Sequence, residues 1–333
     1  MPRQSRLDAP AALHHIIIRG IERKKIFGDN RDKDWYLERL GMILEETETS
    51  CYAWVLMDNH AHILLRTGVE PISTVMRRLL TGYAQYFNRR YDRHGHLFHN
   101  RYKSIICEEE PYLLELVRYI HLNPKRAGMV NDLRQLRYYK YSGHGVIAGG
   151  LKGYEWQDRG YVLGLFDDRE RRAVKAYVEF VSTGIPEGER PDLMGGGLIR
   201  SFGGWDSLKE QKAEGKRING DERILGNSDF VDRVLKKAKK AYEKKTLMKS
   251  KGMNFNHLLN RVLKKYELEK EDLKGGRKKS KIVKARTVLC YLGVNSLGMS
   301  CVEISRELDI SPSTVSKLVY RGKEFKEEIR KLS

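Results

Sequence analysis

Residues 54–66 read Trp-Val-Leu-Met-Asp-Asn-His-Ala-His-Ile-Leu-Leu-Arg, a run rich in strand-forming residues with two histidines near its centre. The pattern predicts a strand over about residues 51–66. Because successive side chains of a strand point to opposite faces, His60 and His62 share one face with Leu64. The opposite row is apolar and suited to pack on a core: Ala61, Ile63 and Leu65.

Two imidazoles side by side on a strand suit a divalent metal, because each neutral ring offers a nitrogen lone pair. A His-X-His pair is also common in sequences where both rings are ordinary strand residues. The pair around Ala61 therefore indicates a metal site only if other residues of the chain support it.

The composition points to a polyanionic partner. The chain has 333 residues, which suggests two or three domains, and its formal net charge is +19 with a pI near 9.6. A surplus of lysine and arginine on this scale favours nucleic-acid binding, because neutralised phosphates release their counterions. The alternative is a basic protein whose charge serves only its solubility.

Several protein classes are disfavoured by the sequence. No apolar run approaches the length of about 18 residues that a membrane-spanning helix needs, so we expect no membrane partner. The first residues, Met-Pro-Arg-Gln-Ser-Arg-Leu-Asp, contain no apolar core of a signal peptide. The cysteines are scattered and form no Cys-X-X-Cys pair, which favours a reducing, cytoplasmic location. They are Cys51, Cys107, Cys290 and Cys301.

The N-terminal part of the chain alternates strand and helix patterns. Its last helix is expected to end at Asn123-Pro124, because proline lacks the N–H of the helix ladder and restricts the residue before it. Strands separated by helices predict an α+β domain whose sheet is covered on one side by helices. The expected strands lie at about 13–21, 51–66 and 97–108, and the expected helices at about 31–49, from Pro71 onward, and 112–121.

The C-terminal residues predict a helical region with a helix-turn-helix at about 300–322. Two short helices flank a tight turn at Asp309-Ile310. Ser311 is a good N-cap for the second helix, and Pro312 fits its first position. The polar outer face of that helix favours DNA binding over an ordinary helical hairpin. The expected major-groove contacts are Ser313, Thr314, Lys317 and Arg321.

Between these regions the pattern is weaker. Residues 140–225 are rich in turns, and a helix at about 227–244 carries a lysine-rich face that either contacts phosphates or is simply solvated. We therefore expect three parts. They are a sheet domain at 1–145, a mostly helical connecting region at 146–250, and a helical DNA-binding domain at 251–333.

Tyr119 and Asn123 lie four residues apart, so a helix places them on one face about 6 Å apart along its axis. The segment that starts at Tyr119 reads Tyr-Ile-His-Leu-Asn-Pro-Lys-Arg-Ala-Gly and follows the His-Ala-His strand by about 60 residues. This combination resembles the single-tyrosine HUH transposases, and among them the REP-associated tyrosine transposases. Residues 95–98, Gly-His-Leu-Phe, and 101–103, Arg-Tyr-Lys, match the same family, and the resemblance covers about residues 10–145.

The resemblance implies a ferredoxin-like α+β fold, with an antiparallel sheet covered by helices, usually in a homodimer. It implies that Tyr119 is the nucleophile, that His60 and His62 bind a divalent metal, and that Asn123 completes the metal site. Such enzymes cut single-stranded DNA beside a REP-like hairpin and leave a 5′-phosphotyrosine link with a free 3′-OH. An oxygen ligand such as that of Asn123 favours Mg²⁺ or Mn²⁺ over zinc.

Other interpretations stay open. Instead of a nucleophile, Tyr119 could be a core tyrosine. Instead of a metal ligand, Asn123 could be an ordinary residue at a helix end. Short family members stop near residue 150, whereas here about 190 further residues follow, and their helix-turn-helix resembles the DNA-binding domain of the bacterial replication initiator. The same features fit a DNA-binding regulator that keeps the fold without cutting. A small-molecule metallohydrolase is disfavoured by the charge. Basic residues expected to hold DNA near the site are Arg19, Arg101, Lys103, Lys125 and Arg126.

Overall fold

The computed structural model describes residues 7–9, 11–68, 70–188, 190–195, 197, 219–250, 254–275, 279–297, 299, 301–325 and 328–329 of the chain. The chain divides into two compact units, residues 1–238 and 239–333. The finer division expected from the sequence, with limits at residues 145 and 250, stays a prediction. Ser300, at the start of the expected helix-turn-helix, lies outside the described residues.

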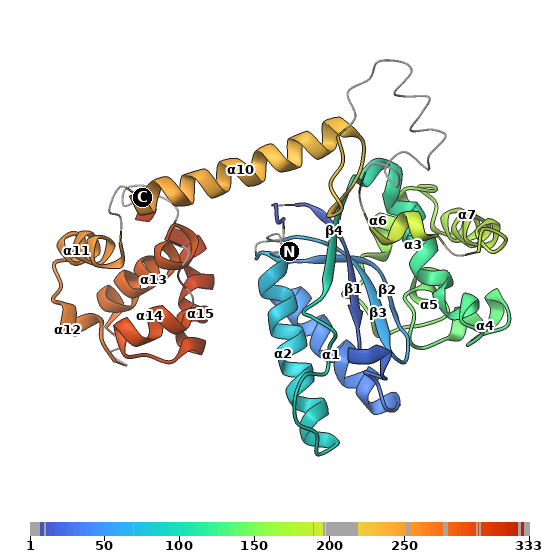
Figure 1. Ribbon diagram of the computed structural model, residues 1–333, viewed down its shortest axis with the longest axis horizontal. Helices are drawn as coiled ribbons and strands as arrows, with labels where there is room; N and C mark the ends of the chain where they lie inside the picture. Colours follow the sequence, from blue (N-terminus) through green and yellow to red (C-terminus); the bar gives the residue numbers. More distant parts are fainter. Residues whose placement is uncertain are drawn as a thin grey trace. The chain divides into compact units, whose positions relative to one another are not determined.

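A five-stranded sheet in the order β2-β3-β1-β4-β5 forms the centre of the first unit (Figure 1). Neighbouring strands are antiparallel except β4 and β5, which pair in parallel. The antiparallel α+β sheet expected from the sequence is confirmed for the first four strands, and the short β5 adds a parallel edge. The bounds are β1 Leu13–Arg19, β2 Ser50–Leu56, β3 His60–Arg66, β4 Lys103–Cys107 and β5 Ile224–Leu225.

The strand expected at 51–66 is instead two strands, β2 and β3, joined by a tight turn. Asp58 and Asn59 form the tip of this hairpin, and Met57 N donates to His60 O over 2.9 Å. Asp and Asn favour such turns, because both tolerate turn backbone conformations and form local hydrogen bonds. The prediction of one strand was wrong because this turn lies inside a run of strand formers. As a result β3 is a central strand, paired with both β1 and β2.

Helices cover both faces of the sheet, whereas the sequence pattern suggested one covered face. α1 and α2 pack on one side, and α3 to α7 lie on the other (Figure 1). The cause lies in the strands, because β1 is buried on both of its rows from Leu13 to Ile18. The bounds are α1 Asn30–Glu46, α2 Ile72–Arg90, α3 Glu109–Arg126, α4 Leu133–Tyr138, α5 His144–Ile147, α6 Arg159–Gly164 and α7 Glu170–Thr183, with short 3-10 turns η1 Ile21–Arg23 and η2 Pro191–Met194.

α3 runs through Pro124 to Arg126, so the helix end expected at Asn123-Pro124 was wrong. Proline has no N–H to donate to Ile120 O, the carbonyl that would otherwise be its partner in the helix ladder. The Asn123 side chain supplies the missing donor, because its Nδ2 lies 3.2 Å from Ile120 O and 2.9 Å from Tyr119 O. The helix therefore continues beyond the proline, and the nitrogen of the Asn123 amide is held on the helix.

Loss of this side-chain donor should destabilise the first unit. We expect Asn123→Ala to lower the free energy of unfolding by about 1–3 kcal/mol, because Ile120 O is left without a donor. In a Pro124→Ala background the main-chain N–H returns, so Asn123→Ala should cost much less there. Urea unfolding of the four proteins measures this double-mutant cycle. Equal costs in both backgrounds would show that Asn123 does not replace the donor that proline lacks.

The second unit is helical and has its own core, which includes Ile304 and Val315. Helices α14 and α15 lie at the positions of the two expected helices, and the helix-turn-helix assignment itself stays a prediction. Ser311 caps α15 by accepting from Thr314 N over 3.2 Å, and Pro312 is the first residue of α15. No helix among the described residues is long and apolar enough to cross a membrane. The bounds are α11 Phe255–Tyr266, α12 Lys270–Leu273, α13 Ser280–Asn295, α14 Cys301–Leu308, α15 Pro312–Arg321 and η3 Gly322–Phe325, and helix α10 Ser228–Ser250 begins in the first unit and ends in the second.

Candidate active site

β3 presents His60 and His62 on the sheet face that α3 covers. Leu64, on the same row, is buried in the core that α3 shares, whereas Ile63 on the other row packs in the core with α1 and α2. The alternation of the strand therefore sets the direction of both imidazoles. Their ring centroids lie 5.2 Å apart.

α3 brings Tyr119 and Asn123 to the same place. The helix buries its apolar side in the core formed with the sheet, and the Tyr119 ring meets His62 edge-on with 5.8 Å between the ring centroids. His60, His62, Tyr119 and Asn123 all line one cavity of about 590 Å³. The four side chains expected to form the reaction centre are thus brought together within a single chain.

Both histidines are neutral at neutral pH. Burial lowers the pKa of His60 to about 4, and the nearby charge of Arg19 adds to the lowering. Burial also holds the pKa of His62 well below its ordinary value, with smaller contributions from His15, His60 and Arg19. A neutral imidazole keeps a nitrogen lone pair, so both rings are in the form that binds a metal.

The donor set fits a hard divalent cation. It consists of two neutral imidazoles and the Asn123 amide, whose nitrogen is engaged on α3 so that its oxygen is the atom left to bind a cation. Among the residues that the structure describes, no group of three His, Cys, Asp or Glu side chains could hold a metal. Such a cation would take its remaining ligands from water or phosphate oxygens, which suits Mg²⁺ or Mn²⁺ better than a closed zinc site.

Arg126 places a positive charge beside Tyr119. Its guanidinium lies 5.2 Å from the centre of the Tyr119 ring, and its Nη1 donates to Tyr119 O over 3.1 Å. Its Nη2 donates to Gly184 O over 3.5 Å, so Arg126 also ties the end of α3 to the end of α7. Burial lowers the pKa of Arg126, and its attraction to Tyr119 opposes that change. The residue therefore holds the helix end in place and adds charge to the cavity.

The other basic residues expected to hold DNA are placed differently from one another. Arg19 lines the cavity with Arg126. Lys103 lies at its rim, where its Nζ donates over 2.6 Å to the carbonyl of Met194, a lining residue. Arg101 instead lines a separate groove of about 570 Å³ beside α2. Lys125 is half-buried near the end of α3 and is not among the lining residues.

The four candidate contacts of the helix-turn-helix lie on α15 in the second unit. Ser313, Lys317 and Arg321 are exposed, and Thr314 is half-buried next to the N-cap. The three exposed residues are therefore available to a partner, as a DNA-reading helix requires.

Sequence reasoning missed several residues at the cavity. His15 is the most informative of them: it stands on β1, fully buried, with its ring centroid 5.2 Å from that of His62 and 6.1 Å from that of Tyr119. Strand alternation places His15 on the same row as Arg19, so a signal was present in the sequence. His15 lies behind His62 and does not itself line the cavity; the missed lining residues are Arg23, Met57, Asn59, Ala127, Pro191 and Met194.

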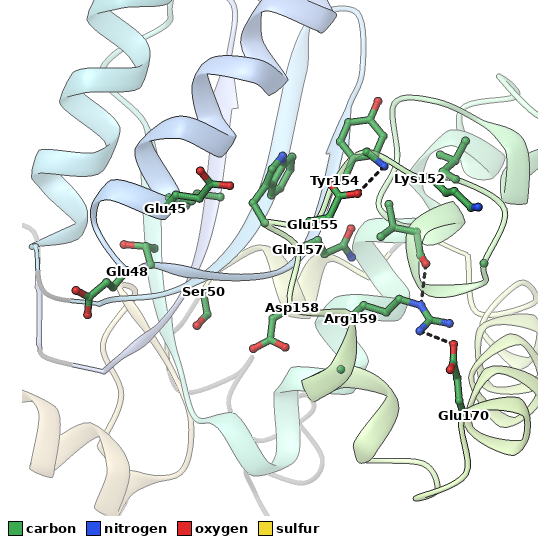
Figure 2. Close-up of a pocket in the computed structure, with 18 residues that line it drawn as sticks. Glu45, Glu48, Ser50, Lys152, Tyr154, Glu155, Gln157, Asp158, Arg159 and Glu170 are labelled. Carbon is green, nitrogen blue, oxygen red and sulfur yellow. Dashed lines mark hydrogen bonds and ion pairs between the residues drawn. The ribbon is translucent and has the colours of Figure 1, made fainter.

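A larger cavity of about 830 Å³ lies elsewhere on the first unit, beside the end of α1, the start of β2 and residues 146–160 (Figure 2). Figure 2 shows its acidic side chains and the ion pair between Arg159 and Glu170, which spans 2.8 Å. Five carboxylates line it against the two cations Lys152 and Arg159, so it repels DNA phosphates. The cavity lined by His60 and Tyr119 is the better candidate for a DNA-binding site. Among the described residues, the charged side chains that line it are three arginines: Arg19, Arg23 and Arg126.

Comparison with known proteins gives a match to a protein family and matches to solved structures. Residues 10–123 match the sequence profile of the family described as "Transposase IS200 like", and this match spans all four residues of the candidate reaction centre. Among solved structures, the chain is similar to a REP-associated tyrosine transposase bound to a REP hairpin. The identity is 17% and the TM-score 0.36, over 47% of this chain and 91% of that chain. Among curated proteins, no match was found.

Proposed function

We propose that the chain, whose residues 10–123 match the IS200-like transposase family, cuts and rejoins single-stranded DNA next to a hairpin through a covalent bond to Tyr119. The observation that carries this proposal is the convergence of Tyr119, His60, His62 and Asn123 on one cavity. A nucleophile and a pair of neutral imidazoles in one arginine-lined cavity support phosphoryl transfer more directly than hydrolysis of a small neutral substrate.

The proposed reaction exchanges one phosphoester bond for another. The Tyr119 oxygen attacks phosphorus, the bond from phosphorus to the 3′ oxygen breaks, and the proton lost by the phenol ends on the leaving 3′-OH. The DNA is left joined to Tyr119 through a 5′-phosphotyrosine bond. Because the bond is exchanged, a 3′-OH can reverse the step without ATP. Strand transfer is then the natural outcome.

The chain contributes the groups that orient and balance charge. His60, His62 and the Asn123 oxygen would hold Mg²⁺ or Mn²⁺, which when bound polarises the phosphate and fixes its orientation. Arg19 supplies further positive charge at the cavity. The Arg126 guanidinium, 5.2 Å from the centre of the Tyr119 ring, balances the negative charge of the deprotonated phenol.

Because one chain provides the nucleophile and the histidines, cleavage does not need a second subunit. The homodimer expected from the resemblance therefore stays a prediction about strand exchange between two DNA ends, separate from cutting itself.

A labelled single strand with a hairpin, incubated with the protein and Mn²⁺, tests the proposal. We expect a covalent protein–DNA band that survives denaturation, and a released strand with a free 3′-OH. The same sequence as a full duplex is the control, because its bases are paired. If hairpin strands bind but never become attached to the protein, the chain is instead a DNA-binding regulator that keeps the fold without cutting.

We also propose that α15 of the second unit enters the major groove of duplex DNA near the cleavage site. Lys317→Ala should weaken duplex binding and reduce the slope of log affinity against log salt by about 1, because a positive charge that neutralises DNA phosphate from the groove is lost. Lys270→Ala removes an exposed lysine of the same unit outside the helix pair and is the matched control. Affinity measured over a range of salt concentrations decides, and equal slopes for both variants would contradict the assignment.

A further inference from the structure

Each histidine of the candidate metal site has one ring nitrogen already engaged by a neighbour. His62 Nδ1 lies 3.0 Å from His15 Nε2, and His60 Nδ1 lies 2.7 Å from Asn59 Oδ1. The direction of these two hydrogen bonds decides which nitrogen of each ring keeps a lone pair. That choice matters, because only a nitrogen without a proton binds a metal.

The direction at His62 follows from the far side of His15. Leu193 O lies 3.1 Å from His15 Nδ1, and a carbonyl oxygen can only accept, so His15 Nδ1 carries a proton and donates it. His15 is fully buried, and a buried imidazole stays neutral, so its Nε2 has a lone pair. His62 Nδ1 must then donate to His15 Nε2. The lone pair of His62 is left on its Nε2.

The direction at His60 follows from the amide of Asn59. Asn59 Nδ2 donates to Arg23 O over 3.1 Å, which fixes the orientation of the amide. Its Oδ1 therefore faces His60 Nδ1 and accepts a proton from it. His60, like His62, is left with its lone pair on Nε2.

We propose that His15 and Asn59 are positioning residues that hold His62 and His60 in the same Nδ1–H tautomer, so that both rings offer Nε2 to one cation. This inference rests on the proposed function, in which the two histidines bind the metal. Partners of this kind orient metal-binding imidazoles and raise their basicity.

Leu193, whose carbonyl accepts from His15, lies beyond the part of the chain that matches the family. Leu193 belongs to η2, whose Pro191 and Met194 also line the cavity, whereas the family match ends at residue 123. The Met194 carbonyl further accepts from Lys103 Nζ over 2.6 Å. The segment after the family domain therefore completes the support of the site, which gives residues 191–194 a specific role.

A purely structural role for His15 is the competing explanation, because its ring stacks on that of His62 at an interplanar angle of 28°. Two substitutions separate the explanations. His15→Phe keeps an aromatic ring in the stack and removes the acceptor. His15→Gln loses the ring and places an amide oxygen near the position of Nε2, so it can still accept from His62 Nδ1.

The first measurement uses the full-length protein without metal. Long-range ¹H–¹⁵N NMR of ¹⁵N-histidine-labelled protein reports which ring nitrogen carries the proton. We expect His15, His60 and His62 all to be protonated on Nδ1. A proton on Nε2 of His62 overturns the role proposed for His15, and a proton on Nε2 of His60 overturns the role proposed for Asn59. Because no metal is present, this result does not depend on the proposed catalytic role.

The second measurement is Mn²⁺ affinity by calorimetry, without DNA. We expect His15→Phe to bind Mn²⁺ about 10- to 100-fold more weakly than the unaltered chain, and His15→Gln to retain most of the affinity. Unchanged affinity in His15→Phe, or an equal loss in both variants, overturns the positioning role. If His15→Phe does not fold, the tautomer of the unaltered chain and the affinity of His15→Gln still decide.

The outcome also separates this inference from the proposed function. If the tautomers are as expected but His62→Ala binds Mn²⁺ as well as the unaltered chain, the metal assignment fails. The hydrogen-bond directions at His15 and Asn59 are then correct, but no metal is bound, so the positioning role is overturned together with the metal site. If His62→Ala loses Mn²⁺ and His15→Phe does not, only the positioning role fails.

Discussion

Replacement of Tyr119 by phenylalanine should abolish the covalent adduct between the protein and a hairpin-bearing strand. Phenylalanine keeps the ring that packs against His62, so the site should stay folded while the attacking oxygen is removed. We expect cleavage to fall by at least about 10³-fold, the scale seen when a nucleophile is deleted. Denaturing electrophoresis of the labelled strand measures the loss, and mass spectrometry of the digested adduct identifies the attached residue.

Tyr112→Phe is the matched control for this experiment. Tyr112 lies on the same helix, α3, but is not among the residues that line the cavity. Its phenylalanine variant should form the adduct at the normal rate. An undiminished adduct in Tyr119→Phe, or a DNA-linked peptide that contains Tyr112, would remove Tyr119 from the role of nucleophile.

Removal of one imidazole should have an effect of similar size through the metal. His62→Ala leaves one histidine and the Asn123 oxygen, which are too few protein ligands to hold Mg²⁺ or Mn²⁺ firmly. We expect Mn²⁺ binding to become undetectable at micromolar concentration and cleavage to drop by about 10³-fold or more, because several kcal/mol of charge stabilisation are lost. Chelation of the metal from the unaltered protein should have the same effect on cleavage, and added Mn²⁺ should reverse it.

His94→Ala serves as the control, because it removes an exposed imidazole that does not line the cavity. Calorimetric titration with Mn²⁺ and the cleavage assay are run on both variants. Full activity of His62→Ala in the presence of a chelator would rule out a metal at this site. Equal losses in His62→Ala and His94→Ala would point to general damage and away from a specific ligand.

Local periodicity and the resemblance to the transposase family together pointed to the residues of the candidate site. Alternation along a strand placed His60 and His62 on one face of that strand, and the helix repeat placed Tyr119 and Asn123 on one face of a helix. Both rules depend only on backbone geometry close to the residue concerned, so they hold without knowledge of the tertiary structure. The structure brings the two faces together at the cavity.

The parts that could not be predicted depend on partners distant in sequence. The end of α3 was misplaced because the rule for proline does not include a side chain, here that of Asn123, that replaces the lost donor. The role of His15 requires the register of β1 against β3 and the carbonyl of Leu193. No local sequence pattern around residues 191–194 predicts that they reach the cavity.

The position of β3 in the sheet bears on how the site is assembled and maintained. β3 is hydrogen-bonded along both edges, to β2 and to β1, and β1 is itself flanked by β3 and β4. Backbone amides in such a central position exchange with solvent only when the surrounding sheet opens. The two imidazoles thus stand on a central strand of the sheet, already arranged before any ion or substrate arrives. A cation can therefore enter and leave without folding or unfolding the site, and the partner that must change shape during the reaction is the nucleic acid.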